Sequence, residues 1–304
     1  MIYRSNLERV LAQGYFAFTA EIGPPKDADG DKIKSKAEML KDCADAFNIT
    51  DNQTAVVRLS SLGGSFILIN MGVEPILQLT CRDRNRIALQ SDILGASSVG
   101  IKNILFLTGD HQSFGNHPSA KGVYDVDSIQ LIKIVKDMRD DGVFESGDEI
   151  KSKKPNVFIG GAANPFADHL EFRVDRLEKK ILAGVDFIQT QSIYNLDRFN
   201  QWLDKVKERG LDKKVFILAG VTPLKSLKMT ERMKFYVPGV DIPDDIYNRI
   251  KKSENPKDEG YQIACDLINR IKKISGVHGI HMTALFWEDI IPSLAREAGF
   301  LPRP

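Results

Sequence analysis

Glu21 is a carboxylate within an otherwise apolar, strand-like run, Phe16–Ile22. The prolines Pro24 and Pro25 follow directly and cannot continue the hydrogen bonding of a strand. Burial disfavours the charged form of a carboxyl, so Glu21 could keep a proton near neutral pH and act as a general acid. The alternative is a carboxylate that points to solvent at the end of the strand.

Asp110 lies directly after a second apolar run, residues 104–107, in the segment Thr-Gly-Asp-His. Gly109 permits close approach of the backbone to a planar ligand, and the carboxylate could accept paired N–H donors of a pterin-like ring. The alternative is an aspartate that only caps the following loop. His111 and His117 share this loop, but two histidines without a third ligand nearby are more often structural, so no metal site is predicted.

Three cations, Arg173, Arg176 and Lys180, recur at the i, i+3, i+7 spacing of one helix face. Such a face could bind the phosphate of a cofactor through charge-assisted hydrogen bonds. A solvated face is the alternative, because acidic residues lie in the same stretch. The glycine pairs at 63–64 and 160–161 fit neither G-x-G-x-x-G nor the Walker A pattern, so the usual nucleotide-binding fingerprints are absent.

Short apolar runs typical of strands alternate along the chain with longer amphipathic stretches. The predicted strands are Phe16–Ile22, Ala46–Thr50, Ile76–Thr80, Asn103–Thr108, Asn156–Gly160, Asp186–Thr190, Val215–Gly220 and Gly279–Ala284. The predicted helices are Ile33–Ala44, Ser61–Met71, Asn85–Ser98, Ser128–Asp140, His169–Ala183, Leu196–Arg209 and Glu288–Ala298.

This alternation predicts an α/β fold, a (β/α)8 TIM barrel, in which the carboxyl ends of the strands carry the catalytic residues. An open, doubly wound sheet has the same alternation and remains the alternative. Residues 238–275 carry extra helical pattern at Ile246–Lys252 and Tyr261–Ile274, which is interpreted as a helical insertion before the last strand. Residues 1–304 are therefore expected to form one domain.

The overall composition indicates which binding partners and cellular locations are unsuited to this protein. A formal net charge of +1 argues against nucleic acid and anionic membranes. No apolar run reaches the length of a membrane span, and the N-terminus has no apolar core of a secretory signal. The three cysteines, Cys43, Cys81 and Cys265, form neither a metal-spaced pair nor a disulfide framework, which suggests a reducing, cytoplasmic location.

Five segments at predicted strand ends, taken in order, resemble the methylenetetrahydrofolate reductase family. They are Ala20–Pro25, Gln78–Cys81, Leu107–Asp110, Ala183–Gln191 and Ile217–Pro223. Each segment is short, but their order at barrel-strand spacing is specific, and the resemblance covers almost the whole chain.

The resemblance implies a barrel that binds a flavin, FAD or FMN, and reduces 5,10-methylenetetrahydrofolate to 5-methyltetrahydrofolate by hydride transfer from flavin N5. It implies that Glu21 protonates the folate nitrogen that leaves, that Asp110 binds the pterin beside the flavin, and that Gln191 is a folate-binding amide. Leu227 falls at a substrate-stacking position. The positions implied for the flavin are Thr50, Gln78, Thr108, Gly109, Asp110 and Asn164, with Arg173, Arg176 and Lys180 toward its phosphates and adenosine.

Some of these positions depart from the family pattern. Gln78 replaces a common histidine and Thr108 an arginine. Leu227 replaces an aromatic residue, and the segment Ser192–Tyr194 replaces a phenylalanine-rich run. The electron donor is therefore either NADH or NADPH, or a partner subunit in a homo- or hetero-oligomer. Two other functions stay open: a pterin-dependent methyltransferase barrel without flavin, and a non-catalytic folate- or flavin-binding subunit of a larger complex.

Overall fold

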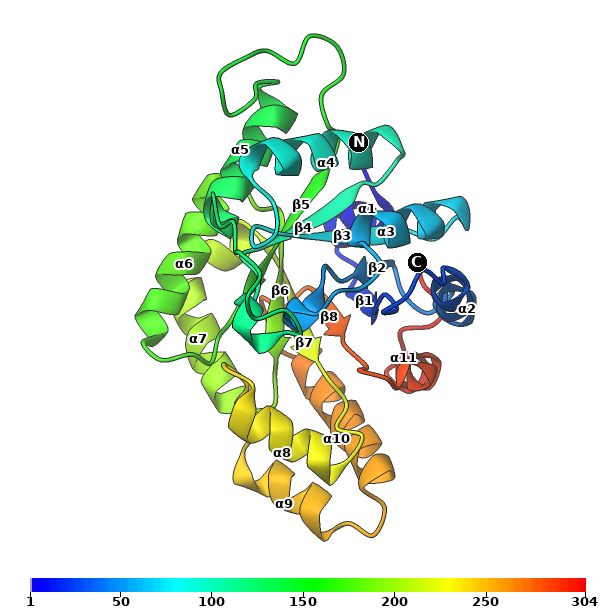
Figure 1. The fold of residues 1–304 in the computed structure, drawn as a ribbon. Coiled ribbons are helices and arrows are strands. Elements are labelled where there is room, and N and C mark those ends of the chain that lie inside the picture. The colour runs from blue at the N-terminus through cyan, green and yellow to red at the C-terminus, as the bar shows by residue number, and fades with distance from the viewer. Residues whose placement is uncertain (1) are drawn as a thin grey trace.

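Eight short parallel strands close into one barrel, in which each strand pairs with the next and β8 pairs with β1 (Figure 1). The computed structural model describes residues 2–304. The strands are β1 Ala17–Ile22, β2 Ala46–Ile49, β3 Pro75–Thr80, β4 Asn103–Leu107, β5 Phe158–Ala163, β6 Phe187–Ser192, β7 Phe216–Val221 and β8 Gly279–Met282. The predicted barrel is confirmed and the open sheet is excluded. β5 begins at Phe158, later than predicted, because the amide of Asn156 donates to Ser97 Oγ (3.1 Å) and not to a neighbouring strand.

Amphipathic helices surround the barrel and cover the outward faces of the strands. They include α2 Asp31–Leu40, α3 Ser61–Asn70, α4 Arg86–Ser98, α5 Ser128–Asp140, α6 Leu170–Ala183, α7 Leu196–Glu208 and α11 Ile291–Glu297. In α7, the buried residues Phe199, Trp202, Leu203 and Val206 follow the spacing of a single apolar stripe. No helix within residues 2–304 is both long and apolar enough to cross a bilayer.

Three helices lie between β7 and β8, where the sequence predicts an insertion: α8 Leu227–Tyr236, α9 Asp244–Lys252 and α10 Pro256–Ile271. They extend together from one side of the barrel (Figure 1). The sequence predicts α9 and α10 but misses α8, whose buried residues are only Thr230 and Met233, so that its apolar stripe is too narrow to recognise. The Ser226 side chain accepts from the amide of Met229 (3.2 Å), which is the start signal that sequence reading could have used.

A second helix missed by the sequence analysis, α1 Asn6–Ala12, covers the amino end of the barrel. Its apolar residues Leu7, Val10 and Leu11 are buried together with inward-facing residues from the starts of the strands, among them Phe158 and Phe187. The aromatic rings of these two residues stack with centroids 5.1 Å apart. The amino half of the barrel interior is therefore apolar and filled, which leaves the carboxyl end for a site.

We expect Leu7→Ala to destabilise the fold by about 2–5 kcal/mol, because it opens a cavity under the barrel floor. Chemical denaturation followed by circular dichroism measures the change. Gln13→Ala, at the exposed end of the same helix, is the matched control and should change stability by less than about 0.5 kcal/mol. Equal stability of Leu7→Ala and the control would show that α1 contributes no packing.

Candidate functional site

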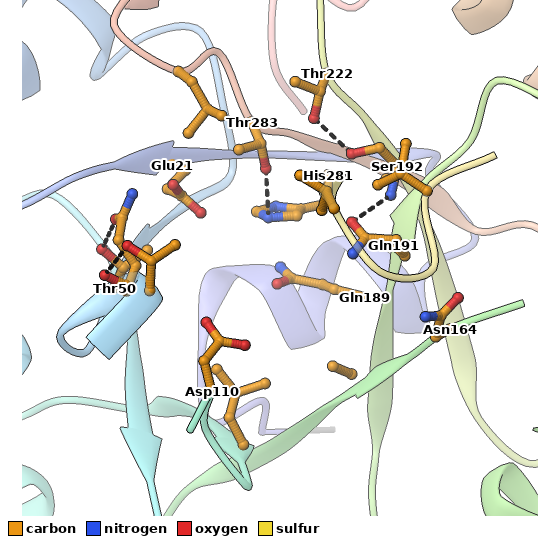
Figure 2. Close-up of a pocket in the computed structure, with 18 of the residues that line it drawn as sticks. Glu21, Thr50, Asp110, Asn164, Gln189, Gln191, Ser192, Thr222, His281 and Thr283 are labelled. Atoms are coloured by element: carbon orange, nitrogen blue, oxygen red, sulfur yellow. Dashed lines mark hydrogen bonds between the residues drawn. The ribbon is translucent and has the colours of Figure 1, made fainter. Parts of the chain in front are cut away.

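A cavity of about 1060 Å³ opens at the carboxyl end of the barrel, opposite α1. Every strand, or the loop that follows it, contributes to its wall, and Figure 2 shows polar side chains from several strands directed into the same space. The volume is at the upper end of the range for pockets that bind organic ligands and cofactors. The barrel thus has an apolar half closed by α1 and a polar half open to ligands.

Glu21, the penultimate residue of β1, lies in the wall of this cavity. Burial raises the pKa of its carboxyl to about 7, and the negative charge of Glu288 adds to the rise, while the positive charges of Lys36 and Arg58 oppose it. Near neutral pH a large share of the molecules therefore carries the proton. A carboxyl that is protonated at working pH and borders a ligand cavity is suited to general acid catalysis.

A hydrogen-bonded chain of side chains crosses the barrel interior next to Glu21. Gln189 and Asn48 exchange two hydrogen bonds (2.7 and 3.0 Å), and Gln189 Nε2 also donates to Thr19 Oγ1 (3.3 Å). Thr19 Oγ1 in turn lies 3.1 Å from Nδ1 of His281, whose Nε2 lies 3.3 Å from the Thr283 hydroxyl. Burial lowers the pKa of His281 to about 4, so the imidazole is neutral at pH 7 and one of its nitrogens accepts a hydrogen bond.

Asp110 lies on the rim beyond β4, and its side chain points toward the same space as Glu21 (Figure 2). Its backbone carbonyl accepts from Arg82 Nη1 (3.2 Å) and from the Tyr124 hydroxyl (3.3 Å). Arg82 is buried and also donates to the carbonyl of Asn52 (3.2 Å). The loop is thus anchored through its backbone, which leaves the Asp110 carboxylate available to a ligand.

The structure brings most of the other predicted flavin-contacting residues to the cavity. Thr50, Gln78, Thr108 and Asn164 line it. Gly109 does not, and it has the left-handed backbone torsion φ +92°. A side chain at Gly109 would lie 3.0 Å from Cβ of Arg82, so the glycine permits the turn that presents Asp110.

The cations of α6 line one side of the cavity, as a phosphate-binding face requires. Arg209, the residue directly after α7, pairs with the acidic residues of α6, at 2.7 Å from Asp175 and 2.9 Å from Glu171, and these acidic residues do not line the cavity. Arg173 Nε is buried and has no hydrogen-bond partner within residues 2–304. The acidic face of α6 therefore lies away from the cavity, whereas the face that carries Arg173, Arg176 and Lys180 borders it.

Lys180 is the most deeply placed of these cations and donates to the carbonyl of Ala162 at the end of β5. Burial, together with the positive charge of Arg176, lowers the pKa of Lys180 to about 8. The two charges are close enough to repel each other, which an anionic ligand would relieve.

Gln191 lines the cavity, whereas Leu227, which was predicted to bind substrate, does not. The side chain of Leu227 packs against the hydrophobic core, and the wall from α8 is formed by other residues, including Met229 and Arg232. Gln191 Oε1 accepts from the amide of Ser192 (3.0 Å), so its Nε2 is the group left for a ligand.

The charge of the cavity wall is strongly positive. Only two carboxylates line it, those of Glu21 and Asp110. The cations that line it are Lys26, Arg58, Arg173, Arg176, Lys180, Lys228 and Arg232. This imbalance favours an anionic ligand. Among residues 2–304, no cluster of three or more His, Cys, Asp or Glu side chains could hold a metal ion.

Sequence reasoning missed several residues of the site, above all Gln189, His281 and Thr283. His281 and Thr283 stand two positions apart at the end of the last predicted strand, and this spacing places both side chains on the same face. Two polar residues at this two-residue spacing, in an otherwise apolar strand, were the sequence pattern that could have indicated these site residues. Met229 and Arg232 had no such signal, because the sequence analysis did not predict α8.

Comparisons with known proteins agree with this architecture. The chain is 24% identical over 251 residues to methylenetetrahydrofolate reductase 2 of Schizosaccharomyces pombe, a match that covers 76% of this chain and 36% of that protein. It is 23% identical over 235 residues to 5,10-methylenetetrahydrofolate reductase of Pectobacterium carotovorum, which covers 76% of this chain and 72% of the relative. The chain thus spans about a third of the length of the yeast protein and most of the bacterial one.

Solved structures confirm the fold. An uncharacterised Clostridium thermocellum protein that binds two copies of 5-methyl-5,6,7,8-tetrahydrofolic acid superposes with a TM-score of 0.69 at 16% identity, covering 97% of this chain and 99% of that one. EDTA monooxygenase from Chelativorans superposes with a TM-score of 0.57 at 10% identity, covering 95% of each chain. The family model of methylenetetrahydrofolate reductase matches residues 6–299, and the chain therefore belongs to this family.

Proposed function

We propose that this protein reduces 5,10-methylenetetrahydrofolate to 5-methyltetrahydrofolate with a bound flavin. The observation that carries the proposal is a protonatable carboxyl, Glu21, in the wall of a large cationic cavity at the carboxyl end of the barrel. Membership of the family supports the substrate, and the cavity supports a reaction that needs both a proton and an anionic cofactor.

A flavin dinucleotide, FAD, suits the residues that line the cavity. Arg173, Arg176 and Lys180 would hold its two phosphates, and the orphaned Nε of Arg173 is a donor that a phosphate oxygen would satisfy. FMN carries a single phosphate and would leave some of these three cations without a phosphate partner. When bound, the flavin supplies hydride transfer, which protein side chains cannot perform by themselves.

The folate is proposed to bind between Asp110 and Gln191, which line the same cavity. The Asp110 carboxylate would accept the neighbouring N–H donors of the pterin ring, and Gln191 Nε2 would donate to a folate oxygen or nitrogen. The Gln191 side chain is oriented by the amide of Ser192, and the loop that carries Asp110 is anchored by Arg82 through the Asp110 backbone carbonyl.

Glu21 would supply the proton of the reaction. Opening of the folate bridge leaves a nitrogen that must be protonated as its bond to the one-carbon unit breaks. The protonated Glu21 carboxyl donates this proton and becomes a carboxylate, and the positive charges of Arg58 and Lys36 stabilise the carboxylate that forms.

The electron donor is proposed to be a partner subunit, with NADH or NADPH as the alternative. Residues that could stack on a nicotinamide are few on the β6 side of the cavity. Ile193 and Tyr194 are buried in the core, where the Tyr194 hydroxyl donates to the carbonyl of Thr222 (2.6 Å), and Leu227 is turned to the core as well.

Glu21→Gln should leave flavin binding intact but slow folate reduction by at least about 10²-fold, because the amide keeps the shape of the carboxyl and cannot donate its proton. Single-turnover oxidation of the reduced flavoprotein by methylenetetrahydrofolate measures this step. Glu254→Gln, an exposed residue, is the matched control. Unchanged folate reduction in Glu21→Gln would refute its role as the acid.

The rate of folate reduction should fall as the pH rises above neutrality. Because the pKa of Glu21 is about 7, the protonated fraction falls roughly tenfold for each pH unit above that value, and the rate should fall with it. In Glu21→Gln this part of the profile should be flat. A wild-type rate that rises between pH 7 and 9 would contradict the assignment.

Asp110→Asn should weaken folate binding by about 10-fold or more while the flavin stays bound, since the amide replaces one acceptor by a donor and removes the charge. Folate titration of the yellow protein, followed at about 450 nm, measures both ligands together. The control is Asp204→Asn on the outer face of α7. Loss of flavin with folate binding retained would show that the carboxylate serves the cofactor.

NADH alone should reduce the bound flavin much more slowly than the enzyme turns over with its full electron supply. Anaerobic stopped-flow mixing of the purified chain with NADH, and separately with NADPH, measures the bleaching of the flavin. Rapid bleaching by either nucleotide would remove the need for a partner subunit.

A further inference from the structure

A second, much smaller cavity of about 30 Å³ lies next to the main one, and Glu21 lines both. Its wall also includes Lys36, Arg58 and Glu288. The volume is sufficient for a water molecule. Glu21 and Arg58 therefore border both the ligand cavity and an adjoining polar chamber, which we call the rear chamber and define by these four residues.

The far side of the rear chamber holds an ion pair between Lys36 of α2 and Glu288 at the start of η4 Glu288–Ile290. These residues are 252 positions apart, so only the closed barrel brings them together. The Glu288 side chain is 14% exposed and that of Lys36 is 31% exposed. Water screens such a pair less than it screens a fully exposed one, so the individual charges still act on Glu21.

Arg58 completes the chamber. Its Nη1 donates to the carbonyl of Pro24 (3.0 Å), and its Nε is buried without a hydrogen-bond partner within residues 2–304. The guanidinium is thus held by the loop after β1, while one donor remains free. Two cations and one carboxylate face Glu21 from this side, and none of them is needed to bind the folate or the flavin in the proposed reaction.

We propose that Lys36 and Glu288 are positioning residues for the proton of Glu21. Through the charges that they place at the rear chamber, they set the pH at which the Glu21 carboxyl loses this proton. The proposal rests on the proposed role of Glu21 as the acid. Glu288 favours the protonated carboxyl by repulsion of the carboxylate, whereas Lys36 favours the carboxylate. Because the two charges are paired, their effects on the Glu21 carboxyl oppose each other in the intact protein.

Because the two charges act in opposite directions, removal of Glu288 and removal of Lys36 should change the titration of Glu21 in opposite directions. In Glu288→Gln, Lys36 and Arg58 are no longer opposed, so Glu21 should lose its proton at lower pH. In Lys36→Met, the unpaired Glu288 should make Glu21 keep its proton to higher pH. Lys26, Asp110 and His281 face the site from the main cavity and are the same in both variants.

A direct titration of Glu21 tests this proposal. The full chain is labelled with ¹³C at glutamate carboxyls, and the Glu21 signal is identified by its loss in Glu21→Gln. We expect the midpoint to fall by about 0.5 pH unit or more in Glu288→Gln, to rise by a similar amount in Lys36→Met, and to lie near wild type in the double variant. Lys34→Met and Glu38→Gln, on the exposed face of α2, are the controls and should leave the midpoint unchanged.

Structural damage would move both single variants in the same direction, so a common direction, or no movement in either, overturns the proposal. If a single variant fails to fold, Glu288→Asp and Lys36→Arg keep the charges and should keep the wild-type midpoint, and a large movement in them also overturns it. The titration needs no flavin and no turnover. It therefore separates failure of this proposal from failure of the reductase assignment, which the kinetics of Glu21→Gln test.

Discussion

Closure of the sheet is the constraint on which the rest of this structure depends. When β8 pairs with β1, the carboxyl ends of all eight strands meet at one rim, and residues far apart in sequence share a single space. Closure also divides the interior into two halves. The amino half is packed with apolar side chains such as Phe158 and Phe187 beneath α1, and the ligand-sized cavity opens at the other end.

This division determines the electrostatics of the site. Glu21 is surrounded by protein because the barrel interior excludes bulk water, and its carboxyl is more easily protonated as a result. The cations of α6 line the cavity, whereas their acidic neighbours pair with Arg209 at the end of α7. The same packing of helices around the barrel thus places a protonatable carboxyl and a cationic wall in one cavity.

The Glu21 carboxyl and the cationic wall of the cavity are both consistent with membership of the methylenetetrahydrofolate reductase family. A reduction at a one-carbon unit needs a proton donor at the folate and a phosphate-bearing cofactor beside it, and the cavity offers residues for both. At Leu227 and Tyr194, two of the positions where this chain departs from the family pattern, the side chains pack into or against the core and do not line the cavity.

The sequence by itself determined the alternation of strands and helices, because apolar runs and helical stripes are local patterns. It also determined the candidates Glu21, Asp110 and Arg173, since their types and their places at strand ends or on one helix face can be read without coordinates. Most of the predicted site residues line the cavity, although their roles remain proposals.

Only the tertiary structure decided which of these side chains share a space. The pair between Lys36 and Glu288, the neutral His281 and the turn of Leu227 into the core depend on residues brought together by barrel closure. The helices α1 and α8 were missed, because short helices with few buried residues carry little periodic signal. Local patterns record which face of an element is apolar, whereas contacts between distant elements, and the burial that alters a pKa, exist only once the chain has closed.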